Sequence, residues 1–217
     1  MVYGKTDSRM NILAIETSLP TASLCLYADG EFRYSSDWTA ERNHDAALFP
    51  ALKQALDTLG DAPLDLILVG AGPGSYGGIR VALAAAVGIA TVKNARIASI
   101  CSWENLAPEG CCMVSDARRG GWTLRRPNGE LMVLTAEQLI SEAENGANIA
   151  TVESAETLSK LGITAVAAGL IPTAQSITQA WNALSETKQE QLLQTPPEPI
   201  YVRPPHITEA KRKPWEV

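Results

Sequence analysis

The residues best suited to chemistry lie in a glycine-rich segment, residues 70–80, with the sequence GAGPGSYGGIR. Glycine permits positive φ and a close approach of the backbone, and the free N–H groups at the start of a helix attract anions. The segment lies between a predicted strand and a predicted helix, so it could hold a phosphate through Gly72, Gly74 and Ser75. The alternative is a tight turn that lets the following helix pack closely on the strand.

Two known phosphate-binding motifs resemble this segment only in part. Gly72, Gly74 and Gly77 satisfy G-x-G-x-x-G, but a dinucleotide site follows the first strand of its unit and has an acid about 20 residues on. Here Pro73 lies inside the segment, and the next predicted strand, residues 96–101, carries no acid. No Lys-Ser/Thr pair closes the glycines, which excludes a Walker loop. We therefore expect no bound cofactor and treat any phosphate site as a vestige.

Glu16 and Asp116 are the acids that could form a catalytic pair, because each ends a predicted strand. Two carboxylates facing a cleft can hold magnesium and activate a hydroxyl, which would suit a small-molecule kinase. The alternative is a pair of strand-end acids in a repeated fold. The only histidines are His44 and His206, which gives no metal-ligand spacing and no nucleophile–base arrangement for a peptidase. We read the four cysteines as reduced core residues.

The first half of the chain predicts strands at residues 11–17, 21–27 and 31–36, with a hairpin turn at Asp29-Gly30. A leucine stripe follows over residues 43–59, at helical spacing, with Pro50 inside it. A buried strand (64–69), the glycine segment, a helix (76–92) and a strand (96–101) complete the order β-β-β-α-β-α-β. This is the order of the ribonuclease-H-like unit that actin, sugar kinases and Hsp70 chaperones use twice.

The second half begins the same plan again, with strands predicted at residues 111–116 and 122–126 and a turn at Asn128-Gly129. Glu16 lies opposite Asp116 at an offset near one hundred, as expected for a duplicated lobe. Helices near 136–144, 155–161 and 173–184, and strands near 149–152 and 164–168, make up the rest. We expect an α/β protein with a disordered extension (1–9), a first lobe (10–105) and a smaller second lobe with a C-terminal tail (106–217).

The two helices of the first lobe predict an apolar surface. One carries the leucine stripe, and the other is rich in alanine and glycine, so that a further helix could lie close to it. If the second lobe does not cover this surface, we expect it to be a partner interface. Its expected residues are Leu48, Leu52, Leu56, Ala82, Ala85 and Ala86.

Charge and hydropathy exclude two classes of partner. A net charge of −6 argues against direct, tight binding of nucleic acid, since proteins that bind a nucleic-acid backbone usually carry a basic face. No stretch reaches the roughly 18 uninterrupted apolar residues that a membrane helix needs, and the start of the chain lacks the apolar core of a signal peptide. We therefore expect a cytoplasmic protein.

Four segments together make the chain resemble the TsaB (YeaZ) family of bacterial proteins. These are NILAIETS, GAGPGSYGGIRVALAAAVGIA, SDARRG and the tail PIYVRP. The resemblance implies the actin-like two-lobe fold and a paralogue, TsaD, that performs the chemistry. In TsaD a helix carries two metal-binding histidines four residues apart; His44 matches the first, but Leu48 stands at the second position. The resemblance thus implies a subunit without a metal site or catalytic residues.

The family's role follows from the same resemblance. It implies that the chain is required for transfer of threonylcarbamoyl to N6 of adenosine 37 in tRNAs that read ANN codons. It further implies pairing with TsaD through the helices of the first lobe, recruitment of the ATPase TsaE to that pair, and a homodimer when the chain is alone. Contact with tRNA would be indirect. The competing hypotheses are a small-molecule kinase of the actin-like class and a glycoprotease-like peptidase.

Overall fold

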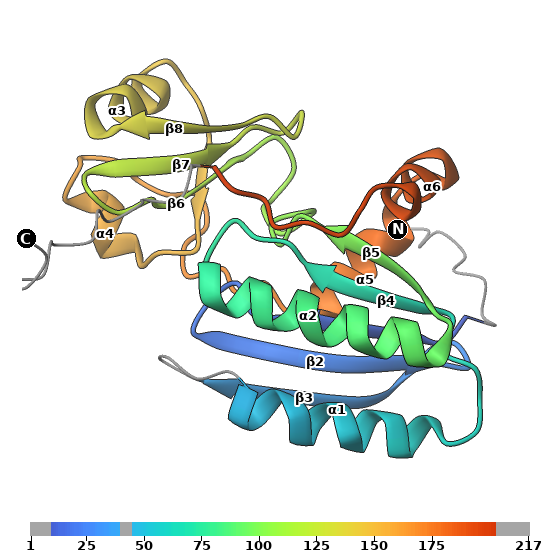
Figure 1. Cartoon of the computed structure of the whole chain (residues 1–217). Helices are drawn as coiled ribbons and strands as arrows, with labels where there is room; N and C mark the ends of the chain where they lie inside the picture. Colours follow the sequence, from blue (N-terminus) through green and yellow to red (C-terminus); the bar gives the residue numbers. More distant parts are fainter. Residues whose placement is uncertain (1–9, 40–44, 203–217) are drawn as a thin grey trace, which may run out of the picture.

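The computed structural model describes residues 10–39 and 45–202, and these form two lobes, each built on one sheet (Figure 1). The first sheet has five strands in the order β3-β2-β1-β4-β5. The antiparallel strands are β1 (Ile12–Glu16), β2 (Thr21–Ala28) and β3 (Glu31–Thr39), and the parallel additions are β4 (Leu66–Gly70) and β5 (Arg96–Ile100). The predicted α/β class, and the predicted order of strands and helices along the first lobe, are confirmed.

The hairpin between β2 and β3 turns at Asp29 and Gly30, both with positive φ (53° and 84°). This is the backbone that a two-residue turn matching the strand twist requires, and Asp-Gly adopts it readily. The Asp29-Gly30 turn signal was therefore read correctly. It sets the register of β2 with β3, in which Ala28 lies opposite Glu31.

Helices cover both faces of the first sheet. Alternate residues of β1 point to opposite faces, so Leu13 and Ile15 pack against α1 (Asp45–Leu59) and α2 (Tyr76–Lys93). Ile12 and Ala14 pack on the other side against α5 (Ala174–Ala183), and α6 (Glu186–Gln194) contacts β5. The centre of the first sheet is thus a buried layer between two helical layers, which is why β1 and β4 are buried at every position.

The packing of α5 and α6 differs from the expected division of the chain. Both helices follow residue 106 in sequence, yet they lie on the first sheet, where α5 contributes Ile177 and Trp181 to the core. The apolar face that β1, β2 and β4 present there would otherwise be exposed to water, and α5 covers it. For the strands, the division between the two lobes at residue 106 stays a prediction. The extension expected at residues 1–9 lies outside the residues that the structure describes.

The second sheet repeats the order of the first, with β8-β7-β6-β9 matching β3-β2-β1-β4 and lacking a fifth strand. Its antiparallel and parallel pairings also match. The elements are β6 (Cys112–Asp116), β7 (Gly121–Arg125), β8 (Leu131–Thr135), α3 (Ala136–Glu144), β9 (Ile149–Thr151) and α4 (Ala155–Ser159). A smaller second lobe on the same plan is therefore present.

Three elements differ from the sequence-based expectation. The strand expected at 164–168 is wrong, because only one bridge, Ala150 to Ala167, forms there. Strand β8 was not predicted; it is half-buried along most of its length and shows no clean alternation. Helix α6 was missed because none of its residues is buried, which leaves no apolar stripe to read.

Helix α2 is long and apolar enough to satisfy the length and composition test for a membrane span. Its buried face, which includes Ile79, Ala82 and Ala86, packs in the core of the first lobe. Packing on the sheet therefore accounts for this side of the helix. Much of its exposed side is apolar as well, including Val87 and Val92.

Candidate functional site: an apolar groove beside a closed glycine loop

The glycine segment forms a tight connection from β4 to α2. Ser75 is the N-cap of α2, and its Oγ accepts a hydrogen bond from Gly78 N at 3.3 Å. Gly72 has φ of 89°, a conformation that favours glycine. A Cβ on Gly74 would lie 2.2 Å from the Ser18 carbonyl oxygen, so a side chain there could not be accommodated. These contacts are those of a turn that needs glycine in order to pack.

Much of the hydrogen-bonding capacity of the loop is already used within the chain. Three of its amides donate inward, to the backbone and to one buried hydroxyl. The bonds are Ala71 N to Ile100 O (2.8 Å), Gly72 N to Ser102 Oγ (3.0 Å) and Ser75 N to Ser18 O (2.6 Å). A phosphate would have to compete with these bonds for the amides of Gly72 and Ser75. The geometry favours the tight-turn alternative, and a phosphate role for Gly72, Gly74 and Ser75 stays a prediction.

Glu16 does not face a cleft. The side chain is fully buried, and its Oε1 accepts a hydrogen bond from Ser18 N at 2.6 Å. Burial raises the pKa of Glu16, while hydrogen bonds from Ser18 and Ser102 work against that shift. Asp116, the other member of the expected pair, is exposed on the second lobe. A buried carboxyl and an exposed one do not make the open magnesium site that the kinase hypothesis needs.

The described residues offer no metal cluster and no activated thiol. No group of three or more His, Cys, Asp or Glu side chains that could hold a metal occurs within residues 10–39 and 45–202. All four cysteines are free, and burial raises the pKa of Cys25 to about 12 and that of Cys101 to about 11. His44 and His206 lie outside the described residues. No catalytic arrangement emerges from the described part of the chain.

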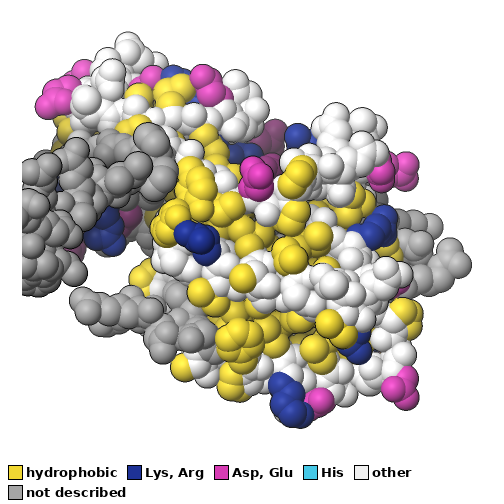
Figure 2. Space-filling model, in the orientation of Figure 1, with side chains coloured by type: hydrophobic (Ala, Val, Ile, Leu, Met, Phe, Trp, Pro, Cys, Tyr) yellow, Lys and Arg dark blue, Asp and Glu magenta, His cyan; other side chains and the backbone are white. Residues whose placement is uncertain are grey.

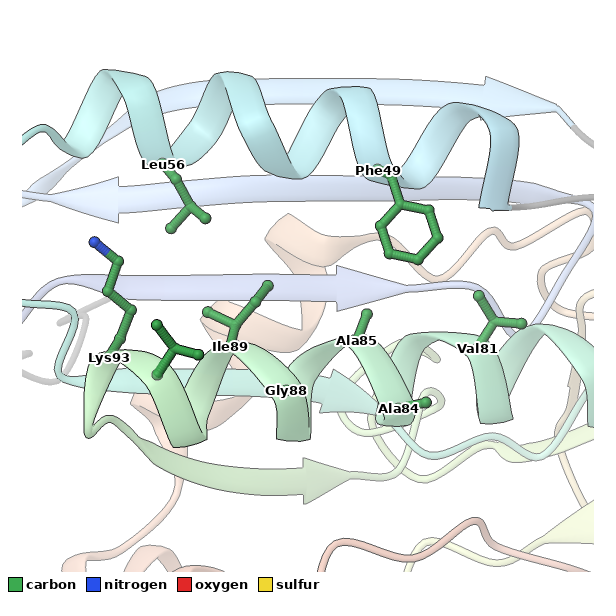
Figure 3. Close-up of a pocket in the computed structure, with 9 residues that line it drawn as sticks. Phe49, Leu56, Val81, Ala84, Ala85, Gly88, Ile89 and Lys93 are labelled. Carbon is green, nitrogen blue, oxygen red and sulfur yellow. The ribbon is translucent and has the colours of Figure 1, made fainter.

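A groove lies between α1 and α2, which run side by side (Figure 1). Its volume is about 660 Å³. Figure 2 shows hydrophobic side chains gathered at the surface between these helices, and Figure 3 shows them projecting from both walls. We call this the α1–α2 groove; it is lined by Phe49, Leu56, Val81, Ala84, Ala85, Gly88, Ile89, Val92 and Lys93.

The groove walls combine large exposed side chains with small ones. Phe49 is 56% exposed and Val92 is 83% exposed, whereas Ala84 and Gly88 leave the surface of α2 low. Lys93 is the one charged residue of the lining. Exposure of such apolar surface to water is unfavourable, and a surface of this kind is typical of one that another protein covers.

The six residues expected at the interface divide into two groups. Leu48, Leu52, Ala82 and Ala86 are at most 4% exposed and belong to the core of the first lobe, so no partner reaches them in this structure. Only Leu56 and Ala85 line the groove. The reason is geometric: helical periodicity finds the stripe that faces the chain's own sheet, and the groove lies on the flanks of those stripes.

The groove residues that the sequence reading missed include Phe49, Ile89 and Val92. One signal could have found them: α2 carries apolar residues around its whole circumference, including exposed Val87 and Val92. A helix at the surface that is apolar on every side needs cover beyond its own sheet.

The known proteins to which the chain is similar in sequence are named for the same tRNA modification. Residues 38–134 match the family TsaD, tRNA N6-adenosine threonylcarbamoyltransferase. The tRNA threonylcarbamoyladenosine biosynthesis protein TsaB of Bacillus subtilis is 34% identical over 119 residues, 51% of this chain and 52% of that protein. TsaB of Escherichia coli is 28% identical over 129 residues, 58% of this chain and 49% of that protein. The matched part spans about half the length of these curated relatives.

Solved structures share the fold over nearly the whole chain. YeaZ from Pseudomonas aeruginosa superposes with a TM-score of 0.66 at 21% identity, covering 88% of this chain and 99% of that one. A second Pseudomonas aeruginosa structure, of a protein with similarity to the peptidase YEAZ, gives 0.65 at 22% identity, covering 89% and 100%. The chain is thus similar in sequence to TsaB proteins over about half of its length, and it shares the fold of YeaZ over nearly all of it.

Proposed function

We propose that the chain is a non-catalytic subunit in tRNA threonylcarbamoyladenosine biosynthesis and works by docking a TsaD-type transferase on the α1–α2 groove. The observation that carries the proposal is the groove itself: an apolar surface on two helices that the second lobe leaves uncovered. The biosynthetic role comes from the names of the curated relatives, both of which are proteins of this pathway.

The chemistry of the groove suits a helical partner. Two helices already form its walls, and small residues on α2 allow the backbone of a third helix to approach closely. A stable pair needs about 800 Å² from each partner, so contacts must continue beyond the groove, along the exposed flanks of α1 and α2. Lys93 has no ion-pair partner among the residues that the structure describes, which favours a partner with a carboxylate at that end.

The rest of the assembly follows from the same proposal. The ATPase TsaE would join the pair, tRNA would be bound through the transferase, and the free chain would cover its groove by forming a homodimer. The acidic balance of the chain, −6 overall, supports indirect contact with tRNA. The site of action would be the cytoplasm.

The absence of catalysis is part of the proposal and has its own support. The amides of Ala71, Gly72 and Ser75 donate within the chain, and Glu16 is buried beneath the loop with Gly70 packed against it. Nothing within residues 10–39 and 45–202 favours the kinase or the peptidase. Titration calorimetry with Mg-ATP tests the kinase directly: we expect no submillimolar binding, and such binding by the isolated chain would contradict the proposal.

A matched pair of valines tests the docking site. Val92→Arg places a charge in the groove at an 83% exposed position, so the fold should be preserved. We expect the dissociation constant for the TsaD-type protein of the same organism to rise at least about tenfold, since an unpaired charge must lose its water on binding. Val166→Arg makes the same change at an exposed site on the second lobe and should leave the constant unchanged.

Calorimetry or size-exclusion chromatography of the two purified proteins would measure this difference. If Val92→Arg binds as tightly as the wild type, the groove is not the docking site. Equal losses from Val92→Arg and Val166→Arg would also contradict the assignment, because the effect would then not depend on the groove.

A further inference from the structure

The far C-terminal part of the described chain returns to the glycine loop. After α6 the chain passes Pro196, Pro197 and Pro199, which have no backbone N–H to donate. The first donor after Pro199 is Ile200 N, and it donates to Ala71 O at 2.8 Å. The loop therefore receives a backbone hydrogen bond from a segment more than a hundred residues away in sequence.

The next residue closes over the start of α2. The ring of Tyr201 stacks on Tyr76 with centroids 5.3 Å apart and planes at 29°. Arg80 then packs over the Tyr76 ring with its Cζ 5.1 Å from the centroid, and its Nη1 donates to Tyr76 Oη at 2.5 Å. Stacked aromatic pairs and cation–π contacts each add a modest attraction beyond the area they bury.

The loop is thus held from two sides. Ser18 and Ser102 bind it from the sheet side, through Ser75 N and Gly72 N. On the other side, the carbonyl oxygen of Ile200 lies 3.8 Å from the position that a Cβ on Gly72 would occupy, so its backbone passes directly over the loop. Both Tyr76 and Tyr201 remain 47% exposed. The contacts on this outer side are few, and they can be made and broken without disturbing the core.

We propose that residues 199–202 are a latch, in which Ile200 and Tyr201 hold the glycine loop and the first turn of α2 in place. Releasing the latch loosens the loop while the sheet stays folded. Any partner that takes hold of this end of the chain would thereby change the order of α2, the helix that also lines the groove. The inference goes beyond the proposed function and does not depend on what the groove binds.

Hydrogen exchange measured by mass spectrometry on the full chain tests the latch. Tyr201→Ala removes the stacking, so the loop should open more often. We expect the amides of Gly72 and Ser75 to exchange about 2- to 10-fold faster, the change in the opening equilibrium that loss of one aromatic pair produces. Ile200→Pro removes the donor to Ala71 and should have an effect of the same size. Tyr201→Phe keeps the ring and should behave as the wild type.

A second aromatic pair provides the matched control. Tyr27 and Phe32 contact each other edge to face, also with centroids 5.3 Å apart, on the β2–β3 hairpin. Phe32→Ala should leave exchange in the glycine loop unchanged. If Tyr201→Ala accelerates only the amide of Ile200 and leaves Gly72 and Ser75 at the wild-type rate, the segment is a passive cover and the latch is wrong. Val92→Arg, the variant that tests docking, should show wild-type exchange in the glycine loop. The latch and the docking site are then tested separately.

Discussion

Two strand ends in the two lobes have the same local structure and opposite surroundings. Glu16 ends β1 and accepts a hydrogen bond from Ser18 N at 2.6 Å, and Asp116 ends β6 and accepts one from Arg118 N, also at 2.6 Å. Each acid thus closes a turn two residues on. Yet Glu16 is fully buried, while Asp116 is exposed.

The difference comes from the neighbouring parallel strand. The register of β1 with β4 places Gly70 beside Glu16, and that of β6 with β9 places Glu153 beside Asp116. Gly70 leaves room for the Glu16 carboxyl, whereas Glu153 contributes its own carboxylate, which accepts from Asp116 N at 3.1 Å. One strand end is therefore sealed by a glycine loop, and the other stays open to water.

The two lobes share one plan, but their equivalent strand ends have different environments. In the first lobe the glycine loop covers the strand ends, and it holds the start of α2, one of the helices that form the groove. In the second lobe the equivalent edge is polar and exposed, without a glycine loop after β9. A pair of acids related by the repeat thus indicates common architecture, and shared chemistry requires a shared environment as well.

The largest expected effect is at Gly70. In Gly70→Ala the new Cβ would lie 1.8 Å from Glu16 Oε2 and 2.8 Å from Ser102 Oγ. Because both neighbours are buried, we expect the free energy of unfolding in urea to fall by about 3 kcal/mol. Glu153→Ala changes the equivalent, half-buried position of the second lobe, where nothing is overpacked, and should cost less than about 1 kcal/mol. Equal losses would show that the two strand ends do not differ as described.

A smaller loss is expected when the loop loses its buried acceptor. Ser102→Ala leaves Gly72 N without a partner in a buried position, which should cost about 1–3 kcal/mol. Ser154→Ala, a serine of the second lobe whose hydroxyl makes an exposed contact with Thr157, should stay within about 0.5 kcal/mol. Chemical denaturation of both variants in the same buffer makes this comparison; a Ser102→Ala variant as stable as the wild type would contradict it.

The smallest effect concerns the charge on the buried acid. Because the pKa of Glu16 is raised above 4.5, the folded chain keeps a proton that the unfolded chain releases. The stabilisation by that proton is complete below pH 4.5 and is lost as the pH rises through the folded pKa. Glu16→Gln carries no such proton, so its stability relative to the wild type should increase with pH over this window and then level off.

Unfolding midpoints measured from pH 4 upward would record this trend. Asp116→Asn retains the oxygen that accepts from Arg118 N and serves as the counterpart in the open strand end. A Glu16→Gln variant whose advantage shrinks as the pH rises would mean that Glu16 is ionised in the folded chain at low pH.

Local signals in the sequence predicted much of the fold. The Asp29-Gly30 turn, the glycine stop after α1 and the alternation in β2 each act within a few residues. They therefore predicted the order of strands and helices along the first lobe. The burial of Glu16 could not be predicted in this way. It depends on Gly70 and Ser102, which the fold brings beside it from distant parts of the chain.

The site was predicted less well than the fold for a related reason. An apolar stripe shows that a helix has a buried face, but it does not say whether the chain's own sheet or a partner buries it. Leu48 and Leu52 turned out to face the sheet, whereas Phe49 and Val92 lie on the free side. Only the placement of α1 beside α2 separates these two cases.

The measurement that tests the account most directly is reconstituted tRNA modification. The TsaD-type transferase, its adenylate-forming enzyme, the ATPase and unmodified tRNA would be combined with this chain, and threonylcarbamoyladenosine would be quantified. We expect the product to require the wild-type chain, to form equally with Val166→Arg and to fall at least about tenfold with Val92→Arg when the chain is below saturation. Full product formation with Val92→Arg, or without the chain, would contradict the proposal that this protein acts by docking through its groove.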